Sequence, residues 1–87
     1  MSPRPNIYHW RSHAGAEVDF LLEHNGTFFP IEVKVKSNPS RADCSGITAF
    51  RSTYPKLKIE KGLVLAPAEK IVQISERDFA MPWDLDG

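Results

Sequence analysis

Apolar and polar residues alternate in three early segments of the chain, as they do in half-buried β-strands. The segments are residues 6–11, 16–23 and 27–36. The apolar faces predicted for the last two are Ala16, Val18, Phe20 and Leu22, and then Phe29, Ile31, Val33 and Val35. The turn between these two segments contains Asn25-Gly26, which predicts a tight hairpin because both residues readily adopt positive φ angles.

After residue 39 the apolar residues recur with a helical period. Ser40 and Asp43 have the spacing of a capping box, and Pro55 ends the helix that we expect between them. Its apolar stripe consists of Cys44, Ile47, Phe50 and Tyr54. Beyond it, the sequence predicts a fully covered strand at 62–66, a short strand at 71–74, and an irregular tail at 80–87 anchored by Trp83.

The predicted order is therefore β-β-β-α-β-β within one domain, residues 1–87. A helix joins the strand at 27–36 to the strand at 62–66, so we expect these two strands to be parallel and linked by a right-handed crossover. This order predicts an α/β (α+β) fold with a mixed sheet and a helix on at least one face.

Charged residues interrupt two of these strands at positions that share a face. Side chains two apart on a strand point the same way, so Glu17 lies with Asp19 and Glu32 lies with Lys34. If the strands pair as a hairpin, these groups meet in the layout of a metal-dependent phosphodiester-cleaving site. Asp19 and Glu32 are then the ligands of Mg²⁺ or Mn²⁺, with the carbonyl of Val33 as a further donor. Lys34 is the catalytic lysine, and Glu17 is an extra ligand or supports the ligands from behind.

The same charges also fit an ordinary solvent-exposed strand face. Glu32 and Lys34 would then pair with each other, which stabilises a protein by roughly 0–1 kcal/mol. The strand pattern alone leaves both interpretations open.

The formal net charge of zero argues against a strongly basic nucleic-acid-binding protein. The charge is uneven, however, because residues 32–61 carry seven basic and three acidic side chains, a balance of +4. This basic segment predicts either a local phosphate-facing surface or a solvated helix face.

The chain contains no apolar run near the ~20 residues of a membrane span and no signal-peptide pattern. Its single cysteine, Cys44, excludes an internal disulfide and fits the apolar stripe of the predicted helix. We therefore expect a cytoplasmic protein without a membrane partner.

Asp19, followed after twelve residues by Glu32-Val33-Lys34, resembles the Asp…(Asp/Glu)-x-Lys pattern of the PD-(D/E)xK nuclease superfamily. A fuller set of segments is similar to the C-terminal, nuclease-like domain of prokaryotic AAA-type ATPases, a domain of unknown function. These segments are Tyr8-His9-Trp10-Arg11, Gly15-Ala16-Glu17-Val18-Asp19-Phe20, Pro30-Ile31-Glu32-Val33-Lys34, Tyr54-Pro55, Gly62-Leu63-Val64 and Pro82-Trp83.

This resemblance implies a restriction-endonuclease-like fold whose usual N-terminal helix is missing, and a C-terminal fragment of a longer ATPase. It implies an Mg²⁺- or Mn²⁺-dependent hydrolase acting on DNA, with the N-terminal ATPase module as a partner. A sheet face without its helix would also favour a homodimer. The alternative is a non-catalytic domain that docks a partner or positions nucleic acid and keeps only a relic of the nuclease site.

Overall fold

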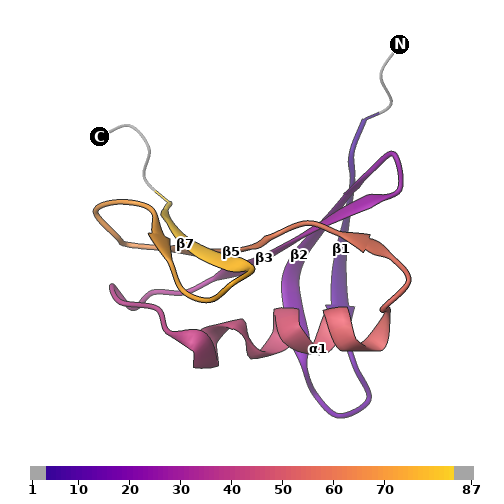
Figure 1. Ribbon diagram of the computed structural model, residues 1–87, viewed down its shortest axis with the longest axis horizontal. Helices are drawn as coiled ribbons and strands as arrows, with labels where there is room; N and C mark the ends of the chain where they lie inside the picture. The colour runs from indigo at the N-terminus through magenta and orange to yellow at the C-terminus, as the bar shows by residue number, and fades with distance from the viewer. Residues whose placement is uncertain (1–3, 84–87) are drawn as a thin grey trace.

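The computed structural model describes residues 4–83 of the chain. These residues form a mixed seven-stranded sheet with one α-helix against one face (Figure 1). The strands are β1 (Asn6–Arg11), β2 (Glu17–His24), β3 (Thr27–Val33), β4 (Lys58–Ile59), β5 (Gly62–Ala66), β6 (Val72–Gln73) and β7 (Asp78–Pro82). A 3₁₀ turn, η1 (Arg41–Cys44), leads directly into α1 (Ser45–Thr53).

Within the described residues, the strands follow the order β1-β2-β3-β5-β7-β6, and β4 pairs with β3 outside that row. β3 and β5 run parallel, as do β5 and β7, whereas β1–β2, β2–β3 and β6–β7 are antiparallel. The predicted parallel link between the third strand and 62–66 is thus confirmed, with η1 and α1 as the crossover.

The hairpin and the helix start form where local chemistry predicts them. Asn25 and Gly26 have φ angles of 54° and 82°, and they connect β2 to β3. The carboxylate of Asp43 accepts a hydrogen bond from the backbone N–H of Ser40 at 2.8 Å, which forms half of the predicted capping box. Both features depend on residues close in sequence, which explains why the sequence pattern predicts their positions.

The tail is ordered further than predicted. Residues 80–82 belong to β7, which lies parallel to β5 over five residue pairs, so the prediction of an irregular tail from residue 80 is wrong there. Trp83 donates its backbone N–H to the carbonyl of Ala66 at 3.2 Å, which continues this pairing by one residue. The rest of the predicted tail, 84–87, lies outside the described residues.

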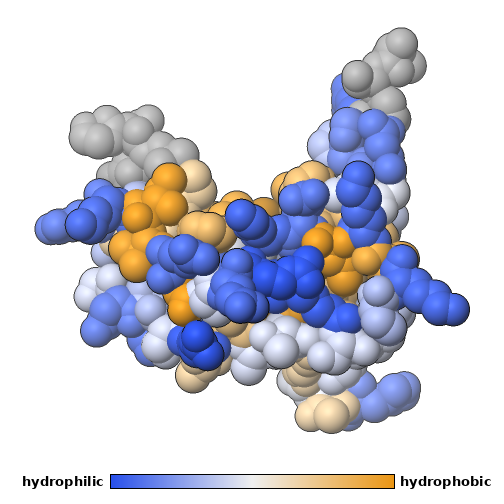
Figure 2. Space-filling model, viewed as in Figure 1, coloured by the Kyte–Doolittle hydropathy of each residue, from blue (hydrophilic) through white to orange (hydrophobic). Residues whose placement is uncertain are grey.

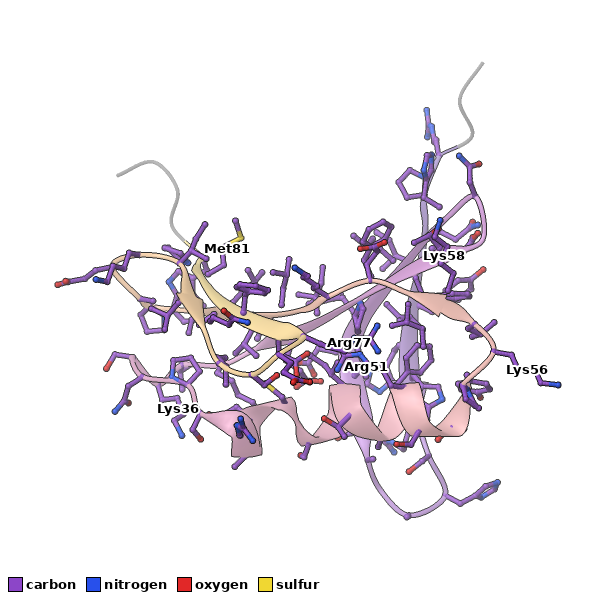
Figure 3. The ribbon with its side chains drawn as sticks, viewed as in Figure 1. Lys36, Arg51, Lys56, Lys58, Arg77 and Met81 are labelled. Atoms are coloured by element: carbon purple, nitrogen blue, oxygen red, sulfur yellow. The ribbon has the colours of Figure 1, made fainter. Side chains whose placement is uncertain are left out.

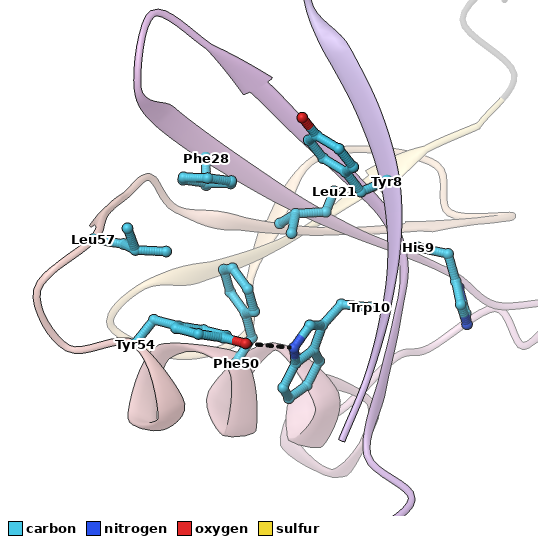
Figure 4. A pocket seen from close by; sticks show the side chains of 8 residues that line it. All are labelled: Tyr8, His9, Trp10, Leu21, Phe28, Phe50, Tyr54 and Leu57. Atoms are coloured by element: carbon cyan, nitrogen blue, oxygen red, sulfur yellow. Dashed lines mark hydrogen bonds between the residues drawn. The ribbon is translucent and has the colours of Figure 1, made fainter. Parts of the chain in front are cut away.

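The core lies between α1 and the β1–β3 side of the sheet. It consists of the buried residues Val18, Leu21, Ile47 and Phe50, the core cluster, with Trp10, Phe28 and Ile59 packed against it. The predicted helix stripe is confirmed for Cys44, Ile47 and Phe50, which are at most 2% exposed. Tyr54 is 40% exposed and instead lines a shallow aromatic groove at the C-terminal end of α1 (Figure 4). Its hydroxyl is 3.4 Å from Nε1 of Trp10, which donates a hydrogen bond to it.

α1 lies unusually close to β2 at Gly46. A Cβ atom at this position would stand 1.8 Å from the carbonyl oxygen of Glu17, so no larger residue fits without a shift of the backbone. The helix therefore begins directly over the strand that carries Glu17 and Asp19.

The apolar face predicted for β3 is wrong. Phe28 packs against the core cluster, and Pro30 and Glu32 share its face of the strand and are buried. Val33 and Val35, which were expected inside, are 37% and 85% exposed. α1 covers the face that carries the acidic residue, so Glu32 lies in the covered layer of the sheet.

The predicted face of β2 is correct only in its first half. Val18 is fully buried as expected, but Phe20 is 47% exposed and Leu21 takes the buried position. A register shift against β1 between these residues reverses the alternation.

The sheet face opposite α1 has no helix over it among residues 4–83 (Figure 1). Ile7, Phe20 and Val33 are exposed there by 66%, 47% and 37%. None of the helices in this part of the chain is long and apolar enough to cross a membrane.

Candidate functional site

The candidate site lies where β2 and β3 separate. Their ladder runs from His24–Thr27 to Phe20–Ile31, and the next position would pair Asp19 with Glu32. There, the side chains replace the backbone bonds of the ladder. The backbone N–H of Asp19 donates to Oε1 of Glu32 at 3.1 Å, and the backbone N–H of Val33 donates to Oδ2 of Asp19 at 3.0 Å.

A bulge in β2 sets the position of Asp19. In the pairing with β1, both Asp19 and Phe20 stand opposite the single residue His9. An extra residue of this kind bends a strand and changes the direction of its side chains. The backbone N–H of Asp19 is thereby available to the Glu32 carboxylate.

Glu32 is a buried carboxylate, with 6% of the residue exposed. Burial raises its pKa above the usual range, and the neighbouring charge of Asp19 raises it further. The hydrogen bond from Asp19 and the charge of Lys34 lower the pKa but do not offset this effect. A cation beside the two carboxylates would therefore be favoured electrostatically.

Lys34 supplies the nearest positive charge. Its backbone N–H donates to the carbonyl of Leu65 at 2.8 Å, which extends the β3–β5 pairing by one residue. Its Nζ is 4.0 Å from Oε2 of Glu32, and the side chain is 37% exposed. The ammonium group thus lies between the buried carboxylate and solvent.

Glu17 lies apart from this pair. Its Oε1 is 2.7 Å from a guanidinium nitrogen of Arg11 and 3.5 Å from Nε2 of His9, and its side chain is 43% exposed. The structure thus brings together Asp19, Glu32 and Lys34, whereas Glu17 is held by the basic side chains of β1.

The donor set fits a divalent ion only in part. No group of three or more His, Cys, Asp and Glu side chains within residues 4–83 is arranged to hold a metal. Each carboxylate uses one oxygen for a backbone N–H, which leaves Oδ1 of Asp19 and Oε2 of Glu32. Two carboxylate oxygens suit Mg²⁺, which often takes one or two protein carboxylates and completes its shell with water and substrate phosphate.

Two residues that the sequence analysis passed over form the main buried ion pair. Nη2 of Arg51 in α1 is 2.7 Å from Oδ1 of Asp78, which is 3% exposed at the start of β7. Ser75 donates its hydroxyl to the other oxygen of Asp78 at 2.8 Å. A local pattern does not reveal this pair, because its members are 27 residues apart and β7 itself is not predicted.

Two other side chains with reactive or charged groups have structural roles. Lys36 lies with Nζ 3.1 Å from Oδ2 of Asp43. Cys44 is 2% exposed, and burial raises the pKa of its thiol to about 11. Neither geometry points to catalysis.

Comparison with known proteins adds a family and distant relatives. The profile of the family described as "Domain of unknown function (DUF4143)" matches residues 2–85. The uncharacterised proteins Rv2008c of Mycobacterium tuberculosis and Mb2031c of Mycobacterium bovis are each 29% identical over 84 residues. The match covers 97% of this chain but only 18% of either relative, so the chain spans less than a fifth of their length. No solved structure matches the chain significantly.

Proposed function

Because the chain belongs to the family described as "Domain of unknown function (DUF4143)", whose description assigns no activity, we propose its function from the β2–β3 site: Mg²⁺- or Mn²⁺-dependent hydrolysis of phosphodiester bonds in DNA. The observation that carries the proposal is the placement of Asp19 and Glu32 side by side where the ladder opens. Two carboxylates there, one of them buried with a raised pKa, form an arrangement that a cation would stabilise.

Asp19 and Glu32 would hold the ion through the oxygens that the backbone does not use, with the carbonyl of Val33 as a further donor. When bound, such an ion lowers the pKa of a water molecule and offsets the charge that develops on the phosphate. The backbone N–H groups of Asp19 and Val33 keep both carboxylates in place beforehand, which avoids reorganisation on binding.

Lys34 would act on the substrate. Its ammonium lies at the solvent side of Glu32, where it can contact a phosphate oxygen and orient the attacking water. Glu17 would join the ligands only if it left Arg11, and in this geometry it pairs with Arg11 and His9.

We also propose that the domain has a restriction-endonuclease-like architecture and belongs to the C-terminal part of a longer ATPase. The parallel β3–α1–β5 crossover with both carboxylates at the β2–β3 opening supports this architecture. The much greater length of the mycobacterial relatives is compatible with further modules in a parent protein. The helix-free sheet face would serve such a module or a second copy.

The proposal is tested by incubating the 87-residue chain with DNA in the presence of Mg²⁺, Mn²⁺ or EDTA. We expect cleavage that requires the ion and is lost in Asp19→Asn and Lys34→Ala. Lys56→Ala, which removes an exposed lysine beyond the C-terminal end of α1 (Figure 3), is the matched control and should cleave normally. Cleavage that persists in Asp19→Asn would overturn the assignment.

A second candidate function is a non-catalytic docking or nucleic-acid-positioning domain. One specific observation favours it: each carboxylate already accepts a backbone N–H group. The pair can therefore be explained as a structural link that joins β2 to β3 where their backbone pairing ends. This alternative predicts no Mn²⁺ binding at the site, which calorimetry measures independently of cleavage.

A further inference from the structure

A polar pocket lies on the seam between α1 and the turn that precedes β7, apart from the carboxylate pair. Its volume is about 370 Å³, and three arginines from three elements line it, together with hydroxyl groups and two acids. The lining residues are Arg41, Thr48, Arg51, Ser75, Glu76, Arg77 and Asp78. Hydrophilic side chains gather at the centre of this face, between two more hydrophobic areas (Figure 2).

We propose that this pocket binds a phosphate group of a nucleic-acid backbone. The lining of the pocket favours a phosphate oxyanion whatever molecule carries it. Only the assignment of that phosphate to a nucleic acid rests on the proposed function. Guanidinium groups are suited to this ligand, since their planar N–H forks match phosphate oxygens.

The wall of the pocket is fixed before any ligand arrives. Arg51 is held by Asp78, and it also donates to the carbonyl of Arg77 at 3.2 Å. The backbone N–H groups of Ile74 and Ser75 donate to the carbonyl of Asp78 at 2.9 and 3.2 Å, which closes the turn. A wall held in this way lowers the entropy cost of binding.

Arg77 is positioned but not saturated. Its Nη2 donates to the carbonyl of Ile59 at 3.0 Å, which directs the guanidinium across the seam next to Arg51 (Figure 3). Its side chain forms no other hydrogen bond or ion pair with residues 4–83. The remaining N–H groups are therefore free to meet a ligand.

Arg41 supplies the second available cation. It is exposed on η1, and its side chain forms no hydrogen bond or ion pair with the described part of the chain. Thr48, also exposed, adds a hydroxyl donor from the neighbouring turn of α1. Two unpaired arginines and a hydroxyl thus face the same space.

The acids in the pocket do not cancel this charge. Asp78 is neutralised by Arg51 and by the hydroxyl of Ser75. Glu76 is exposed and is the unpaired acid among the lining residues, which leaves a local excess of one positive charge: three arginines against two carboxylates. The negative charge of Glu76 should therefore weaken binding of an anion. Removing this charge should strengthen binding, which is opposite to the effect of removing an arginine.

The experiment measures binding of a fluorescent single-stranded oligonucleotide to the 87-residue chain by anisotropy in EDTA, over a range of salt concentrations. We expect Arg77→Gln and Arg41→Gln each to weaken binding about three- to tenfold and to lower the slope of log affinity against log salt by about 1. Glu76→Gln should tighten binding by about the same factor. Lys70→Gln, which removes a charge outside the pocket, should leave both quantities nearly unchanged.

Competition experiments and the Arg41→Gln variant separate the remaining outcomes. Competition by a mononucleotide, or by inorganic phosphate at higher concentration, supports recognition of the phosphate group. Inorganic phosphate that binds while the oligonucleotide does not would overturn the nucleic-acid source. Unchanged affinity in Arg41→Gln, whose exposed side chain has no hydrogen bond or ion pair to lose within the described residues, would overturn the pocket itself. Because these titrations contain EDTA, they measure binding without a divalent ion, so failure of the catalytic proposal leaves this result distinguishable.

Discussion

Asp19 and Glu32 are joined by a hydrogen bond from the backbone of the first to the carboxylate of the second, at the position where β2 and β3 stop pairing. The carboxylate of Asp19 in turn accepts the backbone N–H of Val33. The carboxylates of these two residues therefore replace backbone hydrogen bonds between β2 and β3, and Glu32 is buried. A buried charge beside a second carboxylate lowers the stability of the fold. Such a loss of stability is typical of residues that are retained for function.

Glu32→Gln tests this interpretation through stability. Glutamine keeps an acceptor for the N–H of Asp19 and removes a buried charge beside another carboxylate. We expect the free energy of unfolding of the metal-free protein to stay the same or to rise by up to about 1 kcal/mol, measured by urea denaturation. A loss above about 2 kcal/mol would instead identify Glu32 as a structural residue.

Asp78→Asn should destabilise the protein strongly. It leaves the guanidinium of Arg51 without its charged partner in a largely buried place, with 14% of that side chain exposed. We expect a loss of about 2–4 kcal/mol in chemical denaturation. Lys36→Gln, which removes a half-exposed lysine from its ion pair with Asp43, is the contrast and should cost less than about 1 kcal/mol.

Gly46→Ala reverses the usual effect of this substitution in a helix. Alanine normally stabilises a helix interior by about 1 kcal/mol relative to glycine. Here the new methyl group would overlap the carbonyl oxygen of Glu17, so we expect a net loss of about 2 kcal/mol or more. Ser45→Ala, at the neighbouring exposed position, serves as the control in the same thermal melts. A stabilised Gly46→Ala protein would show that α1 does not approach β2 this closely.

Cys44 should be unreactive toward thiol reagents in the folded protein. Its pKa of about 11 keeps the thiol protonated throughout the range from pH 7 to 9, and burial blocks access. Reaction with a thiol reagent at pH 8 should be slow in buffer and should reach one equivalent only after unfolding in guanidinium chloride. Fast labelling of the native protein would contradict the burial of the Cys44 side chain.

Local chemistry made part of this fold predictable. The Asn25-Gly26 turn, the Ser40–Asp43 cap and the strand at 62–66 each depend on neighbours in sequence, and the structure places all three at the predicted residues. The strand is not fully covered as predicted, because Gly62, Val64 and Ala66 are buried but Leu63 and Leu65 are only partly buried. Asp19, Glu32 and Lys34 lie together as expected, although the bulge that sets the position of Asp19 was not predicted.

The rest depended on contacts between distant segments. The face of β3 that is buried is decided by where α1 lies, so periodicity alone assigned Glu32 to the wrong side. The bulge at Asp19–Phe20 exists only relative to β1. β7 becomes a strand because β5 is available beside it, and its Asp78 needs Arg51 from α1.

The most direct test of the central claim is a calorimetric titration of the 87-residue chain with Mn²⁺. The account predicts binding that is lost in Asp19→Asn and in Glu32→Gln, both of which should remain folded, and that is retained in Glu76→Gln, an acid away from the site. Absence of Mn²⁺ binding to the unsubstituted chain, or equal binding by Glu32→Gln, would contradict the assignment of Asp19 and Glu32 as a metal site.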